Sequence, residues 1–280
     1  MFRVNADLTT AMRYWGGGLD AGEEMLVRTG EKAIDLVLTK RGESRRVRLF
    51  PNVTVEATPR IALVIDGFGY QAAGQIERYL RLPFAWTPVV LPGRARSTWT
   101  VRRCLESGRP PILQLPFEPG DPSHRDPAPG AIPVSMDSVQ IGALVEMRLR
   151  EMDGVIGITQ DMGSPGGESA AVVDPVLDRV ALHRLFCLDS RTSEGSAWPA
   201  EAARKGVRCL SADLFLDGQA SPERATMRKH MLEACDLAAS SGSSILIGHA
   251  RPATLDFLES FRDSASLKGC RLVSIVELLR

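Results

Sequence analysis

The sequence lacks the features that mark several common functional classes. Its 34 Lys and Arg residues balance 34 Asp and Glu residues, so no excess of one charge attracts it to nucleic acid or an anionic membrane. No apolar run approaches the roughly 18 residues of a membrane span. The opening "MFRVNADLTTAMRYW" lacks the apolar core of a signal peptide. We therefore expect a soluble chain without a transmembrane segment, and the sequence leaves open whether an export segment has been trimmed from it.

Cysteine frameworks and nucleotide-binding motifs are also missing. The five cysteines are odd in number and scattered singly, without CxxC or Cys/His clusters, which favours buried free thiols over disulfides or a zinc finger. No Walker A motif is present, and "GFGY" lacks the third glycine of a dinucleotide fingerprint. GxSxG, the nucleophile elbow of α/β-hydrolases, is absent as well. We expect no nucleotide cofactor.

From residue 60 onward, short apolar runs alternate with helical patterns. Such alternation predicts parallel strands joined by helices, and continuous apolarity predicts strands buried on both faces. The predicted strands are 61–65, 84–91, 111–115, 155–159, 185–189, 207–215, 244–249 and 271–279. They predict an α/β fold, a complete or incomplete (β/α) barrel of seven or eight strands.

Three helices between these strands have recognisable starts. Asp137 is a plausible N-cap for a helix over 137–152. Ser221, followed by Pro222, predicts the N-cap of a helix that runs to about Ser240, and Pro252 predicts the start of another.

Residues 1–57 have a different pattern and predict a small α+β appendage to a barrel domain over 58–280. "AGEEMLVRTG" (21–30) predicts a short helix that ends at Gly30, and 33–51 predicts two strands around a polar turn at Arg41–Glu43. Within the barrel, the Pro- and Gly-rich segment 118–136 follows a buried strand directly. A loop of that length favours a functional role.

Polar side chains gather at the ends of the predicted strands, where parallel α/β folds place their active sites. Several such residues on separate strands predict a shared functional site. They are Asp66, Gln114, Glu118, Asp161, Asp189, Arg191, Asp213, Asp217 and His249.

These residues have different alternatives. Asp189 and Arg191 fit a structural salt bridge or a contact to a loop carbonyl as well as they fit a substrate role. We expect Asp213 and Asp217 to be helix caps or loop anchors. His249 ends the apolar run "ILIG", where nearby acids would tune the pKa of a partly buried imidazole, which favours a functional role. The other histidines, His124, His183 and His230, are expected at the surface.

Taken in order, seven segments resemble one family, the divergent polysaccharide deacetylases (family 2), relatives of the NodB-type carbohydrate esterases. They are "IALVIDGFGY", "ILQLPFEP", "PAPGAIP", "GITQDMGS", "FCLDSRTS", "SADLFLD" and "ILIGHARPATLDFL", from residue 60 to about 258. The resemblance implies a distorted (β/α) barrel of about seven strands, with its site at the strand carboxyl ends. It also implies hydrolysis of acetyl groups on a glycan with a divalent metal, in the cell envelope or another extracytoplasmic place.

Matched residue by residue, the resemblance implies that Asp66 is the catalytic base and His249 the general acid. Glu118 matches the second position of a His-x-x-x-Glu/His pattern. The departures fall at metal-ligand positions, where Gly67, Gln114 and Asp161 stand for an acid and two histidines. Substrate contacts are assigned to Glu118, Asp161, Asp189 and Arg191.

The departures leave the metal and the activity open. Gln is a poor ligand for zinc and Gly offers no side chain, whereas Asp66, Glu118 and Asp161 could hold Mg²⁺ or Ca²⁺ through oxygen. One hypothesis is a deacetylase, and a second is a non-catalytic relative that binds a glycan or a protein. A third is hydrolysis of a different bond, with Asp66 and Asp161 as an acid/base pair.

Overall fold

A computed structural model describes residues 18–26, 32–40, 43–49, 58–118, 131–161, 164–218, 222–261, 267 and 269–279. The chain divides into two compact units, Met1–Ala57 and Thr58–Arg280. Residues 119–130, which include His124 and most of the loop predicted to be functional, lie outside the described residues.

The described part of the first unit is an antiparallel sheet with the strand order β1-β2-β3. Its strands are β1 (Gly18–Leu26), β2 (Lys32–Lys40) and β3 (Glu43–Leu49). The two strands predicted around a polar turn are confirmed. The helix predicted over 21–30 is wrong, because 21–26 belongs to β1, where pairing with β2 along its length overrides local helix propensity.

The second unit contains one sheet in which every recorded pairing is parallel. Its strand order is β10-β11-β4-β5-β6-β7-β8-β9, and β12 pairs with the start of β4. The strands are β4 (Arg60–Phe68), β5 (Thr87–Val90), β6 (Ile112–Pro116), β7 (Gly157–Asp161), β8 (Phe186–Asp189), β9 (Cys209–Ser211), β10 (Leu214–Phe215), β11 (Ser243–His249) and β12 (Arg271–Val273).

The sheet curls so that its two edges come together. The strands β9 and β10 occupy opposite ends of the strand order, yet only Ala212 and Asp213 separate them in the chain. Ala212 N–H donates to the Asp189 carbonyl of β8, and Asp213 N–H donates to the Ile245 carbonyl of β11, both at 2.9 Å. Because so few residues reach at most about 10 Å, the sheet forms a distorted barrel, which confirms the predicted fold.

Two predicted strands differ in detail from the structure. The segment predicted as one strand over 207–215 is split between β9 and β10, since it changes neighbours as it crosses the gap in the barrel. The segment predicted as a strand over 271–279 ends at Val273 and continues as the 3₁₀-helix Ile275–Leu278.

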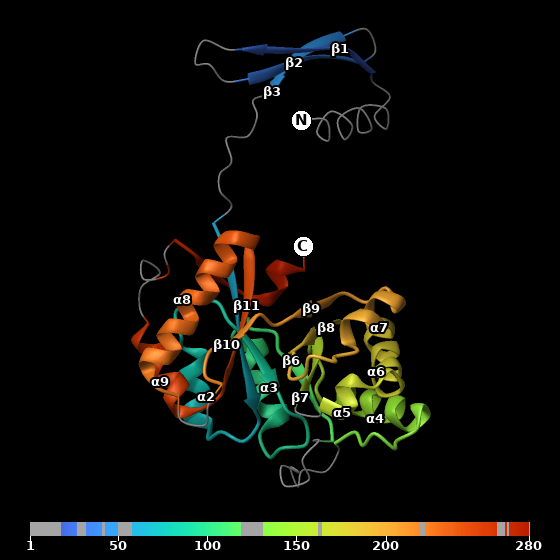
Figure 1. Ribbon diagram of the computed structural model, residues 1–280, viewed down its shortest axis with the longest axis vertical. Coiled ribbons are helices and arrows are strands. Elements are labelled where there is room, and N and C mark those ends of the chain that lie inside the picture. Colours follow the sequence, from blue (N-terminus) through green and yellow to red (C-terminus); the bar gives the residue numbers. More distant parts are fainter. Residues whose placement is uncertain are drawn as a thin grey trace. The chain divides into compact units, whose positions relative to one another are not determined.

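Helices flank the barrel: α8 lies beside β11, α6 and α7 lie beside β8, and α4 packs on α6 (Figure 1). They are α2 (Ala73–Leu80), α3 (Ser97–Glu106), α4 (Ser138–Glu151), α5 (Ser164–Glu168), α6 (Ala170–Leu182), α7 (Trp198–Lys205), α8 (Arg224–Ser241) and α9 (Pro252–Ser260).

Of the three predicted helix starts, two are confirmed and one is wrong. The Asp137 cap of α4 is confirmed. The Asp137 side chain accepts a hydrogen bond from Gln140 N–H, and the Gln140 side chain accepts one from Asp137 N–H. The start of α9 at Pro252 is confirmed. The start predicted for α8 is wrong, because Pro222 precedes the helix and Glu223 is the N-cap; Ser221 is outside the described residues.

The β4 strand is buried on both faces, as its unbroken apolar run predicts. Ile61, Leu63 and Ile65 belong to the cluster between the sheet and the helices. Ala62 and Val64 belong to a second cluster with residues of neighbouring strands, inside the barrel. Alternate residues of each strand therefore face either the helices or the barrel interior.

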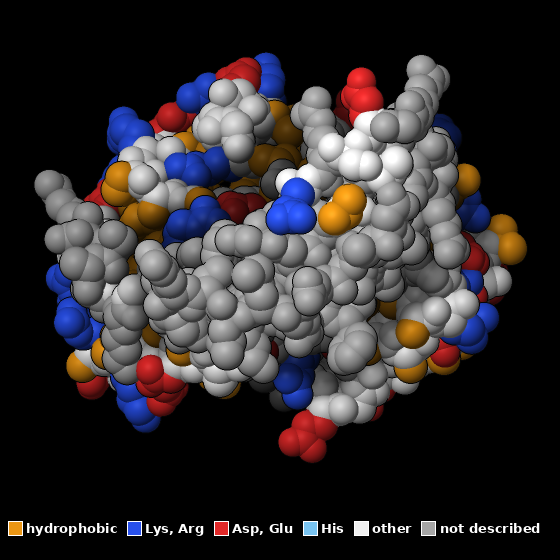
Figure 2. Space-filling model, turned by 90° about the horizontal axis from the view of Figure 1, so that it is seen from above, with side chains coloured by type: hydrophobic (Ala, Val, Ile, Leu, Met, Phe, Trp, Pro, Cys, Tyr) orange, Lys and Arg blue, Asp and Glu red, His pale blue; other side chains and the backbone are white. Residues whose placement is uncertain are grey.

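No single charge dominates the described side chains of the face shown in Figure 2. On the face shown in Figure 2, basic and acidic side chains both appear, with single hydrophobic side chains between them. None of the described helices is long and apolar enough to cross a membrane. Of the five cysteines, all free, four are buried and Cys209 is half-buried, as predicted.

Candidate functional site

The alternation of the strands decides which sequence-predicted residues share the interior of the barrel. Asp66 follows Ala62 and Val64, and His249 follows Ile245 and Ile247, all four of the interior cluster. The two strands are in register, with His249 directly opposite Asp66. The same alternation places Gln114 of β6 and Asp161 of β7 on the interior side, at the same carboxyl edge of the sheet.

The turn after Asp66 explains why a glycine follows it. Gly67 has a φ of +81°, a backbone conformation that residues with a Cβ rarely adopt. Its N–H donates to Oε1 of the buried Gln114 at 3.0 Å. Gln71 closes the turn, because its Nε2 donates to the Gly67 carbonyl at 3.0 Å and to the Ala250 carbonyl at 2.9 Å. The turn therefore links the ends of β4, β6 and β11.

His249 is held by Asp217, which lies just beyond β10. His249 Nδ1 and Asp217 Oδ1 are 2.7 Å apart, and the His249 N–H donates to both oxygens of the Asp217 carboxylate at 3.1 Å. Asp217 is fully buried and also accepts from the Thr254 hydroxyl of α9. The ring of Phe215 stacks on the imidazole, with centroids 6.1 Å apart. These contacts fix the tautomer and the orientation of His249.

A carboxylate oxygen of Asp66 faces a ring nitrogen of His249. Asp66 Oδ1 lies 3.8 Å from His249 Nε2, the ring nitrogen that Asp217 leaves available. The Asp66 side chain is 15% exposed and that of His249 30% exposed. Asp66 Oδ1 is buried and has no hydrogen-bond partner among the described residues. A buried carboxylate oxygen without a partner is rare in folded proteins, and it marks this atom as a candidate for contact with a ligand.

Burial and neighbouring charges move the pKa values of this group. Burial raises the pKa of Asp66 to about 7, and the nearby carboxylates of Asp161 and Asp217 add to the effect, while His249 and Arg251 oppose it. Burial alone would lower the pKa of His249, but the hydrogen bond to Asp217 and the charge of Asp66 raise it above its usual range. Burial opposes ionisation of Asp217 too, yet its bonds to His249 and Thr254 hold its pKa below the usual range.

Asp189 and Arg191 lie outside this arrangement. Asp189 shares the side of β8 that carries Cys187, which belongs to the cluster beneath the helices. Its Oδ1 accepts from Gln160 Nε2 at 2.8 Å and from the backbone N–H of Arg191 at 2.9 Å. Neither a salt bridge of this pair nor a contact to a loop carbonyl is recorded among the described residues, and Asp189 accepts from the Arg191 backbone N–H instead. The Arg191 side chain is exposed.

Glu118 and Asp161 lie at the ends of adjacent strands, where the loop returns to the barrel. Phe117 N–H donates to the Asp161 carbonyl at 3.1 Å, and Glu118 Oε2 accepts from Val134 N–H at 3.2 Å. Both side chains are half-buried. The structure therefore brings Asp161 to the carboxyl edge of the sheet, which also carries Asp66. It places Glu118 against Val134, in the described segment that begins at residue 131.

The donors of the described residues do not fit a divalent metal. Among those residues, no three His, Cys, Asp or Glu side chains form a group able to hold a metal ion. Gly67 offers no side-chain ligand, and the Gln114 carbonyl oxygen is already bound to Gly67 N–H. The family resemblance expects an acid at position 67 and a histidine at position 114 as metal ligands. Gly67 and Gln114 are instead hydrogen-bonded to each other.

Sequence reasoning assigned Asp213 and Asp217 the same role, and the structure separates them. Asp213 is an anchor as expected, since its Oδ2 accepts from Ile245 N–H at 2.7 Å. Asp217 is instead the partner of His249. The sequence signal for Asp217 was the second acid of "SADLFLD". However, 31 residues lie between Asp217 and His249 in the sequence, and the pairing of β10 with β11 brings them together.

The two other described histidines, His183 and His230, have structural contacts. His183 Nε2 lies 2.8 Å from Glu146 Oε2 on the surface, as predicted. His230 Nδ1 lies 3.0 Å from the Leu216 carbonyl, and the contact is partly buried rather than fully at the surface.

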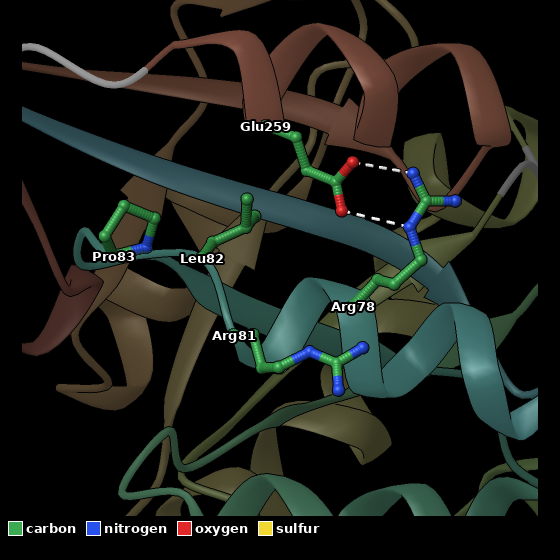
Figure 3. Close-up of a pocket in the computed structure, with 5 residues that line it drawn as sticks. All are labelled: Arg78, Arg81, Leu82, Pro83 and Glu259. Atoms are coloured by element: carbon green, nitrogen blue, oxygen red, sulfur yellow. Dashed lines mark hydrogen bonds and ion pairs between the residues drawn. The ribbon is translucent and has the colours of Figure 1, made fainter.

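A cavity of about 570 Å³ lies between α2 and α9 and contains none of the candidate residues. Its lining is Arg78, Arg81, Leu82, Pro83 and Glu259 (Figure 3). The guanidinium of Arg78 points to Glu259, with bonds of 3.0 and 2.6 Å, and also binds Asp256 at 2.8 Å. Two carboxylates thus neutralise this cation, and the pair connects the two helices.

Comparisons with known proteins find related sequences. The chain is 28% identical over 200 residues to the uncharacterized protein YibQ of Escherichia coli (strain K12), which covers 71% of this chain and 61% of that protein. It is 26% identical over 204 residues to an uncharacterized protein of Haemophilus influenzae, over 73% and 71% of the two chains. The chain thus spans less than two thirds of the E. coli relative.

A solved structure and a family model complete the comparison. The structure of an uncharacterized protein from Agrobacterium tumefaciens C58 superposes with a TM-score of 0.70 at 21% identity, over 79% of this chain and 89% of the other. The family model described as divergent polysaccharide deacetylase matches residues 63–279, which include both Asp66 and His249. The chain belongs to the divergent polysaccharide deacetylase family.

Proposed function

We propose that this protein hydrolyses acetyl groups on a glycan, with Asp66 and His249 as its acid–base pair. One observation carries the proposal: Asp66 Oδ1, which has no hydrogen-bond partner among the described residues, lies 3.8 Å from His249 Nε2, and Asp217 holds the opposite nitrogen of that ring. A carboxylate with a pKa near 7 and a histidine with a raised pKa can accept and donate protons at neutral pH. Family membership supports a glycan as the substrate.

The chemistry follows from which group is ionised. Ionised Asp66 takes a proton from a water molecule as that water attacks the acetyl carbonyl carbon. The tetrahedral intermediate collapses when protonated His249 gives its Nε2 proton to the leaving nitrogen or oxygen of the sugar. The products are acetate and a free amine or hydroxyl group, and the proton taken by Asp66 restores that lost by His249. Asp217 keeps the imidazole oriented and stabilises its cation.

Other residues take supporting parts in this proposal. Asp161 and Glu118 lie at the ends of neighbouring strands, on the side where the glycan would enter, and they are proposed as substrate contacts. The exposed Arg191 extends the same role to the end of β8, while Asp189 fixes its backbone. The family relation supports an extracytoplasmic place of action, where polysaccharide substrates are found.

A specific observation favours a second function, that of a glycan-binding relative without catalysis. Gln114 and Gly67 are bound to each other where the family resemblance expects metal ligands. A site that lacks the means to polarise the acetyl carbonyl would bind a glycan and leave it intact. The Asp66–His249 pair distinguishes the functions, because a binding protein gains nothing from a raised histidine pKa.

Acetate release from acetylated chito-oligosaccharides, measured together with the metal content of the purified protein, tests the proposal. Wild-type protein should release acetate, and His249→Gln should reduce the rate by about 10²- to 10⁴-fold. The matched control is His183→Gln, which changes a surface histidine paired with Glu146 and should keep the rate. Oligosaccharide binding without acetate release would refute the enzyme and leave the binding protein. Equal rates in wild type and His249→Gln would refute the acid–base pair.

A further inference from the structure

Two cysteines lie side by side on neighbouring strands of the barrel. Cys187 of β8 and Cys209 of β9 are register partners in the parallel pairing of these strands. The Cys187 N–H donates to the Arg208 carbonyl at 2.9 Å, so the two strands are bonded next to the pair. We propose that the two thiols form a reversible disulfide that locks β9 onto β8, with a low-molecular-weight disulfide as the oxidant. This lock is independent of the proposed acetyl chemistry.

The arrangement of the two strands suits a disulfide. Neighbouring strands lie about 4.8 Å apart, and the Cα atoms of a disulfide lie roughly 4.4–6.8 Å apart. Cys187 belongs to the cluster between the sheet and the helices, and Cys209 packs against that same cluster. The next residue of each strand, Leu188 and Leu210, is instead part of the interior cluster or packed against it. Both cysteine side chains therefore point to the same side of the sheet.

The two thiols already interact. The Cys187 thiol is hydrogen-bonded to that of Cys209, and this bond and burial, with a contribution from the nearby Asp189, raise the pKa of Cys187. The Cys209 thiol in turn donates to the Leu210 carbonyl, with 3.6 Å between sulfur and oxygen. Cys187 thus stays a neutral thiol in the reduced protein, with its sulfur held against that of its partner.

An oxidant is expected to reach the pair through Cys209. Cys187 is fully buried, whereas Cys209 and the other two residues of β9 are half-buried. β9 ends the strand order of the sheet, and β8 is the one strand recorded beside it in the described part of the chain. An accessible thiol beside a buried one is the arrangement of an attacking and a resolving cysteine.

The oxidation balances in electrons and protons. The Cys209 thiolate attacks one sulfur of the oxidant, whose other half leaves as a thiolate and takes up the proton that Cys209 lost. The Cys187 sulfur then attacks Cys209 Sγ in this mixed disulfide, gives up its proton and releases the second half as a thiol. Two protein thiols are thus oxidised by two electrons, and one disulfide is reduced to two thiols.

The position of the pair favours a bond that can be reversed. Side chains of parallel neighbours run side by side, so their Cβ atoms lie about as far apart as the strands, slightly wider than the roughly 3.5–4.5 Å of a relaxed disulfide. Such a disulfide is more readily reduced. Beyond Cys209 the chain crosses from β9 to β10 through Ala212 and Asp213, so the lock would act beside the seam of the barrel.

Thiol counting after incubation of the folded chain with oxidised glutathione tests the pair. Wild type should lose two of its five thiols and become lighter by two hydrogen atoms. Digestion without reductant should then give a linked peptide pair that contains Cys187 and Cys209. Cys187→Ala should instead keep one glutathione on Cys209, because the resolving thiol is missing. Cys209→Ser should keep its remaining thiols. The matched control, Cys104→Ala, removes a buried cysteine of α3 and should still lose two thiols.

Thermal unfolding measures the lock itself. Oxidation should raise the unfolding temperature of wild type by about 5–10 °C, leave that of Cys209→Ser unchanged, and be reversed by dithiothreitol. Wild type that keeps all five thiols, a link between other cysteines, or a linked pair without a rise in unfolding temperature would refute the lock. Cys209→Ser, at a half-buried position, decides the matter if Cys187→Ala does not fold. Acetate release is measured on reduced protein, so none of these outcomes bears on the proposed function.

Discussion

The two halves of the candidate site differ in what their buried polar groups do. On the β4–β11 side, Asp66 and His249 face each other across a register pair, and Asp217 holds the imidazole. On the β6–β7 side, Gln114 is buried at the corresponding edge, but its amide oxygen binds the backbone of Gly67. The first half has groups poised to exchange protons with a ligand, and the second has a polar group that serves the fold.

This difference separates a contact that stabilises the turn after β4 from the proposed acid–base pair. The bond from Gln114 to Gly67 stabilises the same turn that positions Asp66, so the β6 side supports the acid–base pair without taking part in it. Substitutions on the β4–β11 side should therefore lower acetate release far more than a substitution of Gln114 on the β6 side. The expected effects follow in order of size.

Asp66→Asn should have the largest effect, a loss of acetate release of about 10²- to 10⁴-fold, because the amide cannot accept the proton of the attacking water. Affinity for the glycan should change much less, since the amide keeps the shape of the carboxyl group. Initial rates and titration calorimetry on the same preparation measure both. A variant that keeps a tenth or more of the wild-type rate would place the base elsewhere.

Asp217→Asn should lower the free energy of unfolding by about 3–5 kcal/mol, since it leaves the His249 cation without its buried partner. The stability from the raised pKa of His249 is present below its unfolded value, about 6.5, and is lost as pH rises through the raised one. The stability from Asp217 is present above about pH 4 and lost at lower pH. The loss should therefore be greatest between about pH 4 and 6.5.

Urea unfolding of Asp217→Asn across this pH range measures the effect. Asp213→Asn is the matched control, because Asp213 accepts from a backbone N–H of the same strand pair and an amide oxygen can replace it. A loss for Asp217→Asn that is no greater than the control, or equal at pH 5 and pH 9, would argue against a charged pair.

Asp66→Asn should also stabilise the fold at high pH, by about 2–4 kcal/mol at pH 8. The folded pKa of Asp66 is raised from 3.8 to about 7, so its contribution to stability is complete below pH 3.8 and is lost as pH rises to about 7. At pH 4 or below, the neutral carboxyl and the amide should be nearly equivalent. Denaturant midpoints at pH 4 and pH 8 measure the gain, and equal midpoints for wild type and variant at pH 8 would contradict the raised pKa.

Gln114→Leu should have the smallest effect, a loss of about 1–3 kcal/mol in stability from the buried Gly67 N–H that it leaves without an acceptor. Acetate release should fall only a few-fold, because Asp66 and His249 remain. Gln140→Leu, which removes the side chain that completes the α4 capping box, is a control on the surface. A rate loss for Gln114→Leu as large as that for Asp66→Asn would assign Gln114 to the chemistry.

The sequence predicts the barrel well because its signals are local. Runs such as 61–65 are apolar throughout since both faces are buried, and Asp137 is followed three residues later by its capping partner. The helix predicted over 21–30 fails because the pairing of β1 with β2 decides the structure there. The single strand predicted over 207–215 fails because closure of the barrel divides it.

The site is predictable only in part because its contacts are not local. Asp66 and His249 stand out as polar ends of apolar runs, and the structure places them opposite each other. The role of Asp217 depends on a pairing between strands that are distant in sequence. The position of Asp189 depends on which side of β8 it occupies, and a run of apolar residues on both sides conceals that alternation.

The pH dependence of acetate release, compared between wild type and Asp217→Asn, tests the central claim most directly. In wild type the rate should rise as Asp66 ionises near pH 7 and fall at higher pH as His249 loses its proton. In Asp217→Asn the falling limb should move to lower pH, because the bond that raises the pKa of His249 is weakened. An unmoved falling limb, or no acetate release at any pH, would contradict the acid–base pair.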